Sequence, residues 1–204
     1  MKRTKELEFP TLFKQSIHYF YMFFISFLTI FSSKYSKDLF DRFKVDINYE
    51  EEDYWTDIIK RENLKESIEE LKVAIRESIE GFEHTMKVAK DLSKKGYITS
   101  IMSNHSVEWF EAISDKLGFK EFILEKHTIV SAKVGHAKPR KEIMDSLMQC
   151  FLPLNIKPQE IVYFDDKQKN VDSANEYGLC AYKFNSSKKS EEYMWNILSK
   201  HSIE

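Results

Sequence analysis

The second half of the chain alternates short β-favouring runs with amphipathic segments. The β-favouring runs, which predict strands, stand at residues 97–102, 122–124, 128–130, 161–164 and 179–184. Apolar residues at three- and four-residue spacing predict helices at 82–95, 107–117, 141–151, 171–177 and 191–198. Strands that alternate with helices predict an α/β fold, in which a parallel sheet is flanked by helices on both faces.

The first 80 residues follow a different pattern, because all five glycines come after them. Tight turns between strands and helices rely on glycine, so a stretch without glycine favours helices over βα repeats. Residues 37–79 also repeat apolar side chains at helical spacing, as in Leu64, Ile68 and Leu71. We therefore predict an apolar helical segment over 1–36, a helical region over 37–80 and an α/β core over 81–204.

Residues 15–33 contain no Asp, Glu, Lys or Arg. A membrane-spanning helix needs roughly 20 mainly apolar residues, so membrane association through this segment is one interpretation. Gln15 and His18, together with hydroxyl-bearing side chains, disfavour it, and basic residues on both sides remove any charge asymmetry. The other interpretation is an aromatic-rich helix packed against a soluble domain.

Charge and cysteine content narrow the class of protein. The chain has 31 basic and 33 acidic residues and a formal net charge of −2. It shows no basic stripe interleaved with aromatic residues, so we predict no nucleic-acid partner. Its two cysteines give neither metal-ligand spacing nor a disulfide framework, which favours the cytoplasm.

Two adjacent carboxylates, Asp165 and Asp166, follow the predicted strand at 161–164. Neighbouring acids repel, and the usual remedies are a hard cation such as Mg²⁺ or a raised pKa on one of them. In open α/β sheets, ligands bind just beyond the carboxyl ends of the strands. The pair therefore predicts a metal site, and the structural alternative is a strand that ends in an acidic turn.

Two further polar positions flank predicted helices. Ser103 and Asn104 follow the first predicted strand of the core, where a hydroxyl and free backbone N–H groups suit a phosphate; the same residues are also common helix caps. Lys138 precedes Pro139, which we predict to begin the next helix. A lysine there can reach a phosphate as a point charge, or can simply be exposed.

The order of these elements resembles the haloacid dehalogenase (HAD) superfamily of phosphohydrolases, in particular its members with a small helical cap. The resemblance covers roughly residues 77–185 and includes Asn170-Val171 and the spacing from Ala174 to Gly178. It implies a Rossmann-like core, with residues 37–80 as a cap-like region.

The same resemblance implies a role for each candidate residue. Ser103 would bind the phosphoryl oxygens, and Asn104 would shape the turn. Lys138 would offset the phosphate charge and steady the nucleophile. Asp165 and Asp166 would hold Mg²⁺, and the substrate would be a small phosphorylated metabolite.

The catalytic nucleophile of that family is missing from the sequence. The family uses an Asp-x-Asp motif at the end of the first strand of the sheet, and no Asp-x-Asp occurs in this chain. Glu6-Leu7-Glu8 and Asp46-Ile47-Asn48 are partial echoes, but glutamates reach farther than aspartates, and Asp46 lies among predicted helices.

Two hypotheses for the function follow. One is a Mg²⁺-dependent phosphatase that is impaired or inactive as written. The other is a catalytically silent phosphate- or protein-binding module, whether a pseudoenzyme or a truncated gene product. Loss of the first strand would also expose the edge of its neighbour, and residues 15–33 are one candidate to cover that gap.

Overall fold

The computed structural model describes residues 34–79, 81, 83–184 and 190–203. Its core holds four short strands: β1 (Ile101–Ser103), β2 (Thr128–Val130), β3 (Val162–Asp165) and β4 (Cys180–Lys183). β1 pairs with β2 and β3 pairs with β4, both in parallel. The predicted α/β fold with parallel strands is therefore confirmed.

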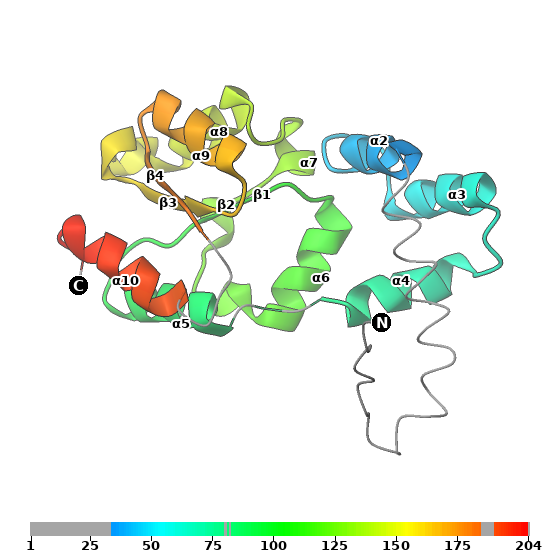
Figure 1. The fold of residues 1–204 in the computed structure, drawn as a ribbon, viewed down its shortest axis with the longest axis horizontal. Helices are drawn as coiled ribbons and strands as arrows, with labels where there is room; N and C mark the ends of the chain where they lie inside the picture. Colours follow the sequence, from blue (N-terminus) through cyan, green and yellow to red (C-terminus); the bar gives the residue numbers. More distant parts are fainter. Residues whose placement is uncertain (1–33, 80, 82, 185–189, 204) are drawn as a thin grey trace, which may run out of the picture.

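Helices cover both faces of the strands (Figure 1). α8 (Lys141–Phe151) and α9 (Gln168–Tyr177) pack on one face, where their apolar side chains form a cluster with Met102, Ile129 and Ala181. α5 (Glu83–Lys94) and α10 (Ser190–Lys200) pack on the other face against Val162 and Phe164. Successive side chains of a strand point to opposite faces, so Tyr163 joins the α8–α9 cluster while its two neighbours join the other.

Among the described residues the strands form two separate pairs, and no described strand lies between β1 and β3. The α8–α9 cluster nevertheless includes side chains from both pairs, so one hydrophobic core joins them. The hypothesis that residues 15–33 cover a sheet edge concerns a segment outside the described part of the chain.

The helical region consists of α2 (Lys34–Phe43), α3 (Glu51–Glu62) and α4 (Ile68–Glu77), which lie on the right of Figure 1. These helices pack against α6 (Val107–Leu117) through a cluster that contains Phe43, Tyr54, Trp55 and Trp109. Ser67 begins α4 with a reciprocal capping box, in which its hydroxyl accepts from the Glu70 N–H.

The structure thus shows helices across residues 37–79, as predicted, whereas most of the predicted segment 1–36 lies outside the described residues. None of the helices in the described ranges is long and apolar enough to span a bilayer.

Two local predictions are wrong. Residues 122–124 form no strand, because a 3₁₀ turn at Phe119–Glu121 leads into them and the Ile123 N–H donates to the Phe119 carbonyl. Pro139 does not begin a helix: α8 begins at Lys141, with Arg140 as its extended N-cap residue. A one-turn helix that was not predicted, α7 (Ser131–Val134), follows β2 directly.

Candidate phosphate site

The candidate residues come from the carboxyl ends of two strands and from one loop. Ser103 is the last residue of β1, and Asp165 is the last residue of β3. Lys138 lies in the loop between α7 and α8. Ligands of open α/β sheets bind at such strand ends, so the fold supplies a suitable platform.

Asn104 fixes the backbone of Lys138. Its Oδ1 accepts from the Lys138 N–H at 2.8 Å, and its Nδ2 donates to the Lys138 carbonyl at 3.0 Å. This reciprocal pair of bonds ties the loop to the end of β1. The side chain of Asn104 thus bonds to the backbone of the Lys138 loop, and its predicted role in shaping its own turn stays a prediction.

The Lys138 ammonium connects the two strand pairs. Nζ donates to the Met102 carbonyl of β1 at 2.7 Å and to Asp165 Oδ2 at 2.8 Å. The Lys138 side chain is 12% exposed and that of Asp165 is 3% exposed, so the ion pair is largely removed from water. The ammonium is thereby held at the carbonyl of Met102, the residue before Ser103, and links the ends of β1 and β3.

The Asp165 carboxylate accepts three hydrogen bonds besides that of Lys138. The Tyr163 hydroxyl donates to Oδ2 at 2.5 Å. The Lys167 N–H and Asn170 Nδ2 donate to Oδ1 at 2.9 and 2.8 Å. The sequence predicts Tyr163 only as part of a β-favouring run. The signal for its contact with Asp165 is the i, i+2 spacing, which places both side chains on one face of the strand.

These contacts determine the charge state of the site. Burial alone would raise the pKa of Asp165, but the charge and hydrogen bond of Lys138, with the bonds from Tyr163 and the Lys167 N–H, lower it to about 2. Burial and the bond to Asp165 raise the pKa of Tyr163 well above its ordinary value. At neutral pH Asp165 is therefore a carboxylate and Tyr163 a neutral phenol.

Asp166 and Ser103 differ in their surroundings from Asp165. Asp166 is exposed at the surface, while Ser103 is half-buried. The structure thus brings Ser103, Asn104, Lys138 and Asp165 to one edge, and places Asp166 at its margin. The roles assigned to these residues stay predictions.

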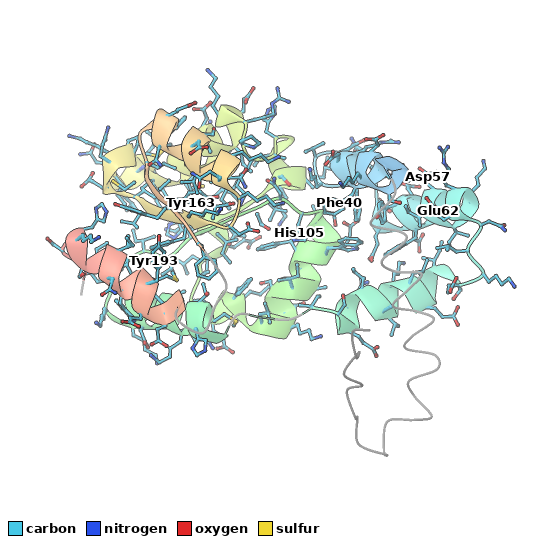
Figure 2. All side chains as sticks on the ribbon, viewed as in Figure 1. Phe40, Asp57, Glu62, His105, Tyr163 and Tyr193 are labelled. Carbon is cyan, nitrogen blue, oxygen red and sulfur yellow. The ribbon has the colours of Figure 1, made fainter. Side chains whose placement is uncertain are left out.

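His105 is a residue of this site that the sequence reasoning missed. Its Nδ1 is buried and has no hydrogen-bond partner within the described part of the chain. Burial, and then the charges of Lys138 and Lys167, lower the pKa of His105 to about 4, so the ring is neutral at physiological pH. Figure 2 shows His105 between the strands and the helical region, where Phe40 packs against it edge-on at 6.3 Å.

A small cavity of about 190 Å³ opens beside His105. It lies between α4 and α6, and its wall is mainly apolar. The lining residues are Ile75, Arg76, Ser78, Ile79, His105, Trp109, Ala112 and Ile113. His105 thus belongs both to this wall and to the loop that follows Ser103.

The donor set does not fit a preformed magnesium site. Both oxygens of Asp165 already accept hydrogen bonds, two on each oxygen. Within the described ranges, no group of three or more His, Cys, Asp or Glu side chains is placed to hold a metal ion. Magnesium demands nearly ideal octahedral geometry from oxygen ligands, so Asp165 would first have to release a donor.

Of the two partial echoes of the nucleophile motif, the structure describes the one at Asp46. Asp46 lies in the turn after α2, where its carboxylate accepts from Arg42 Nε and from the Asn48 N–H. These bonds give Asp46 a local role in the turn. Glu6 and Glu8 lie outside the described residues.

Comparison with known protein families decides the classification. The model of the haloacid dehalogenase-like hydrolases matches residues 15–182, which is most of the chain. The chain belongs to this family. The resemblance seen in the sequence is therefore confirmed, and the HAD-like fold extends across the helical region as well as the strands.

Solved structures agree with this assignment. A HAD family enzyme from Bacteroides thetaiotaomicron superposes with a TM-score of 0.66 at 15% identity, over 78% of each chain. The complex of that enzyme with magnesium and inorganic phosphate superposes with a TM-score of 0.63 at 17% identity, over 76% of this chain and 78% of that chain. A predicted HAD-like family hydrolase from Porphyromonas gingivalis superposes with a TM-score of 0.58 at 18% identity, over 78% of each chain. No curated protein sequence matches this chain significantly.

Proposed function

We propose that this HAD-like protein binds the phosphoryl group of a small phosphorylated metabolite at the carboxyl ends of β1 and β3, and that its hydrolytic activity is impaired. The observation that carries the proposal is the position of the Lys138 ammonium. It is fixed between Met102 and Asp165, directly beside the end of β1.

The chemistry around Lys138 suits an anion. Lys167 follows the acid pair, and its positive charge, like that of Lys138, lowers the pKa of His105. The Ser103 hydroxyl offers a donor at the same edge, and α6 and α9 both begin within a few residues of their strands. Phosphate groups favour such helix N-termini, because backbone N–H groups and the positive end of the helix dipole face them.

Impaired hydrolysis follows from the carboxylates near Lys138. In the described part of the chain, Asp165 is the one carboxylate that pairs with Lys138. Its oxygens are engaged by four donors, so it is poorly suited to attack a phosphorus atom. Nucleophilic catalysis needs an activated and accessible oxygen, and a misplacement of about 1 Å can cost roughly 10²-fold in rate.

Binding is tested with inorganic phosphate by calorimetry and by thermal unfolding of the full chain. Phosphate at about 100 times its Kd should add about 2.7 kcal/mol to the free energy of unfolding. Ser103→Ala should weaken binding without disturbing the buried ion pair. Lys133→Met, which removes an exposed lysine of α7, is the matched control and should bind as the wild type does. Equal phosphate affinity in Ser103→Ala and wild type would contradict the proposed site.

A second candidate function is a Mg²⁺-dependent phosphatase. The observation that favours it is the similar HAD family enzyme, whose structure is a complex with magnesium and inorganic phosphate. A panel of phosphate monoesters with Mg²⁺ separates the two candidates. Phosphate release that Asp165→Asn abolishes would support the phosphatase, whereas binding without release supports the impaired form. A cytoplasmic location and the absence of a nucleic-acid partner remain predictions from composition.

A further inference from the structure

The hydrogen bonds to Asp165 leave no acceptor position on its carboxylate. A carboxylate has about four lone-pair sites. Lys138 Nζ and the Tyr163 hydroxyl take those of Oδ2, and the Lys167 N–H and Asn170 Nδ2 take those of Oδ1. All four donors come from the protein itself, so the carboxylate is satisfied without a metal ion.

Three of these donors are fixed by the architecture of the site. The Lys167 N–H precedes α9, Asn170 is a buried residue of that helix, and Lys138 is held by Asn104. The fourth donor is the Tyr163 hydroxyl, which substitution by Phe removes without changing the backbone, a charge or the packed ring. Its ring packs in the α8–α9 cluster, so the hydroxyl points at Oδ2 from a fixed position.

We propose that the Tyr163 hydroxyl excludes a divalent cation from Asp165, so that this site binds phosphate through Lys138 and Ser103 without magnesium. The inference rests on the proposed phosphate-binding function and specifies its mode. A cation on Oδ2 would have to displace the hydroxyl and would also lie close to the Lys138 ammonium on the same oxygen. Asp166, the other acid of the pair, is exposed and adds no preformed ligand set.

Tyr163 is thus a positioning residue that acts through Asp165. The phenol neutralises none of the carboxylate charge, but it completes the hydrogen bonding that a metal ion would otherwise supply. A cation that takes this position must first break the hydrogen bond from the Tyr163 hydroxyl to Oδ2. Hydrogen bonds to charged groups are among the stronger ones, so this competition weakens metal binding by about tenfold or more.

The test uses Tyr163→Phe, which removes only the hydroxyl, in the full-length protein. Isothermal titration with MgCl₂ should show Mg²⁺ affinity about tenfold or more higher in Tyr163→Phe than in the wild type, because the competing hydrogen bond to Oδ2 is gone. Inorganic phosphate should bind the wild type equally well in EDTA and in MgCl₂, whereas its affinity for Tyr163→Phe should rise with Mg²⁺. Tyr177→Phe is the matched control: its hydroxyl also donates to a carboxylate, that of Asp145 at 2.6 Å, but away from the site.

The outcomes separate the inference from the function on which it rests. Phosphate affinity of the wild type that increases with Mg²⁺ would overturn the inference and leave the phosphate site intact. Absence of phosphate binding with or without Mg²⁺ would refute the proposed function. In that case the MgCl₂ titrations still decide the role of Tyr163, and equal affinities in wild type and Tyr163→Phe would overturn it. The wild-type titrations require no variant to fold.

Discussion

At the scale of single residues, Lys138 and Asp165 form an ion pair that is largely removed from water. Removing two charges from water is costly, and the attraction between them compensates only when further hydrogen bonds satisfy both groups. Here Met102 supplies an acceptor to the ammonium, and three additional donors serve the carboxylate. The cost of burying the two charges is therefore offset by the hydrogen bonds that both groups make with their neighbours.

This pair makes stability depend on acid pH. The pKa of Asp165 is about 2 in the folded protein against an ordinary 3.8, so its contribution is complete above about pH 4 and is lost as the pH falls toward 2. The contribution is on the order of 2 kcal/mol. Urea unfolding of wild type and Asp165→Asn should give a stability difference that shrinks by about this amount between pH 5 and pH 2.

The adjacent acid supplies the control for that experiment. Asp166→Asn changes an exposed side chain, so its stability should stay within about 0.5 kcal/mol of the wild type across the same pH range. Parallel pH profiles for wild type and Asp165→Asn would show that the ion pair does not contribute in this way.

The sequence predicts the site only in part at this scale. The positions of Ser103 and Asp165 could be predicted, since both lie at the ends of strands. Lys138 lies in a loop, and the family resemblance was what pointed to it. The contribution of Tyr163 could not be predicted, because an aromatic residue in a buried strand usually signals packing alone. The burial of His105 depends on Phe40, which lies far away in the sequence.

At the scale of elements, one buried carboxylate joins the helical region to α6. Glu51 begins α3 and accepts from the indole N–H groups of Trp55 and Trp109. Arg76 of α4 donates to both of its oxygens, at 2.9 and 2.7 Å. Three helices therefore meet at a side chain that is only 4% exposed.

Glu51→Gln should destabilise the fold, because it removes the negative charge that Arg76 pairs with. The indole N–H groups and the guanidinium would then share a neutral amide that offers only one oxygen as acceptor. Hydrogen bonds to charged groups are worth about 1.5–3 kcal/mol, so we expect a loss of about 2 kcal/mol in urea unfolding. Glu52→Gln is the control, since Glu52 is exposed and pairs only with Lys72 at the surface. Equal stabilities for the two variants would contradict the joining role of Glu51.

Two helices have the bounds that the sequence predicts, although only α6 has clear caps at both ends. α6 and α8 have the predicted bounds, and Gly118 ends α6 with a φ of 67°, a conformation that favours glycine. β1 is shorter than predicted, because pairing with β2 involves only Ile101 to Ser103. The short helix α7 carries no such signal, and its first residue, Ser131, bonds to backbone carbonyls of Lys44 and His105 that lie far away in the sequence.

At the scale of the whole molecule, α6 follows the end of β1 closely and packs against the helical region, and the Ser131 hydroxyl after β2 donates to the Lys44 carbonyl after α2. Trp109 of α6 packs against Trp55 and Phe43, while Phe110 on the same helix is also buried. We therefore expect the helical region and the α/β core to unfold in one transition. Tryptophan fluorescence of a Trp195→Phe variant, which reports on Trp55 and Trp109, should coincide with far-UV circular dichroism. Fluorescence that changes at a lower urea concentration would show that the helical region opens first.

The overall α/β class was predictable from the alternation of runs, but the division of the strands into two pairs was not. Which strands pair depends on contacts between distant segments, and no local pattern encodes them. The predicted domain boundaries at residues 36 and 80 remain untested.

Within the residues that the structure describes, β1 pairs on one side, with β2, and no described strand pairs with its other edge. Exposed strand edges accept further strands through main-chain hydrogen bonds. An extended apolar peptide added in parallel to β1 would finish beside Ser103, next to the ammonium of Lys138. A synthetic peptide whose final residues carry a carboxylate would in this way bring a second acid to the proposed phosphate site from another molecule.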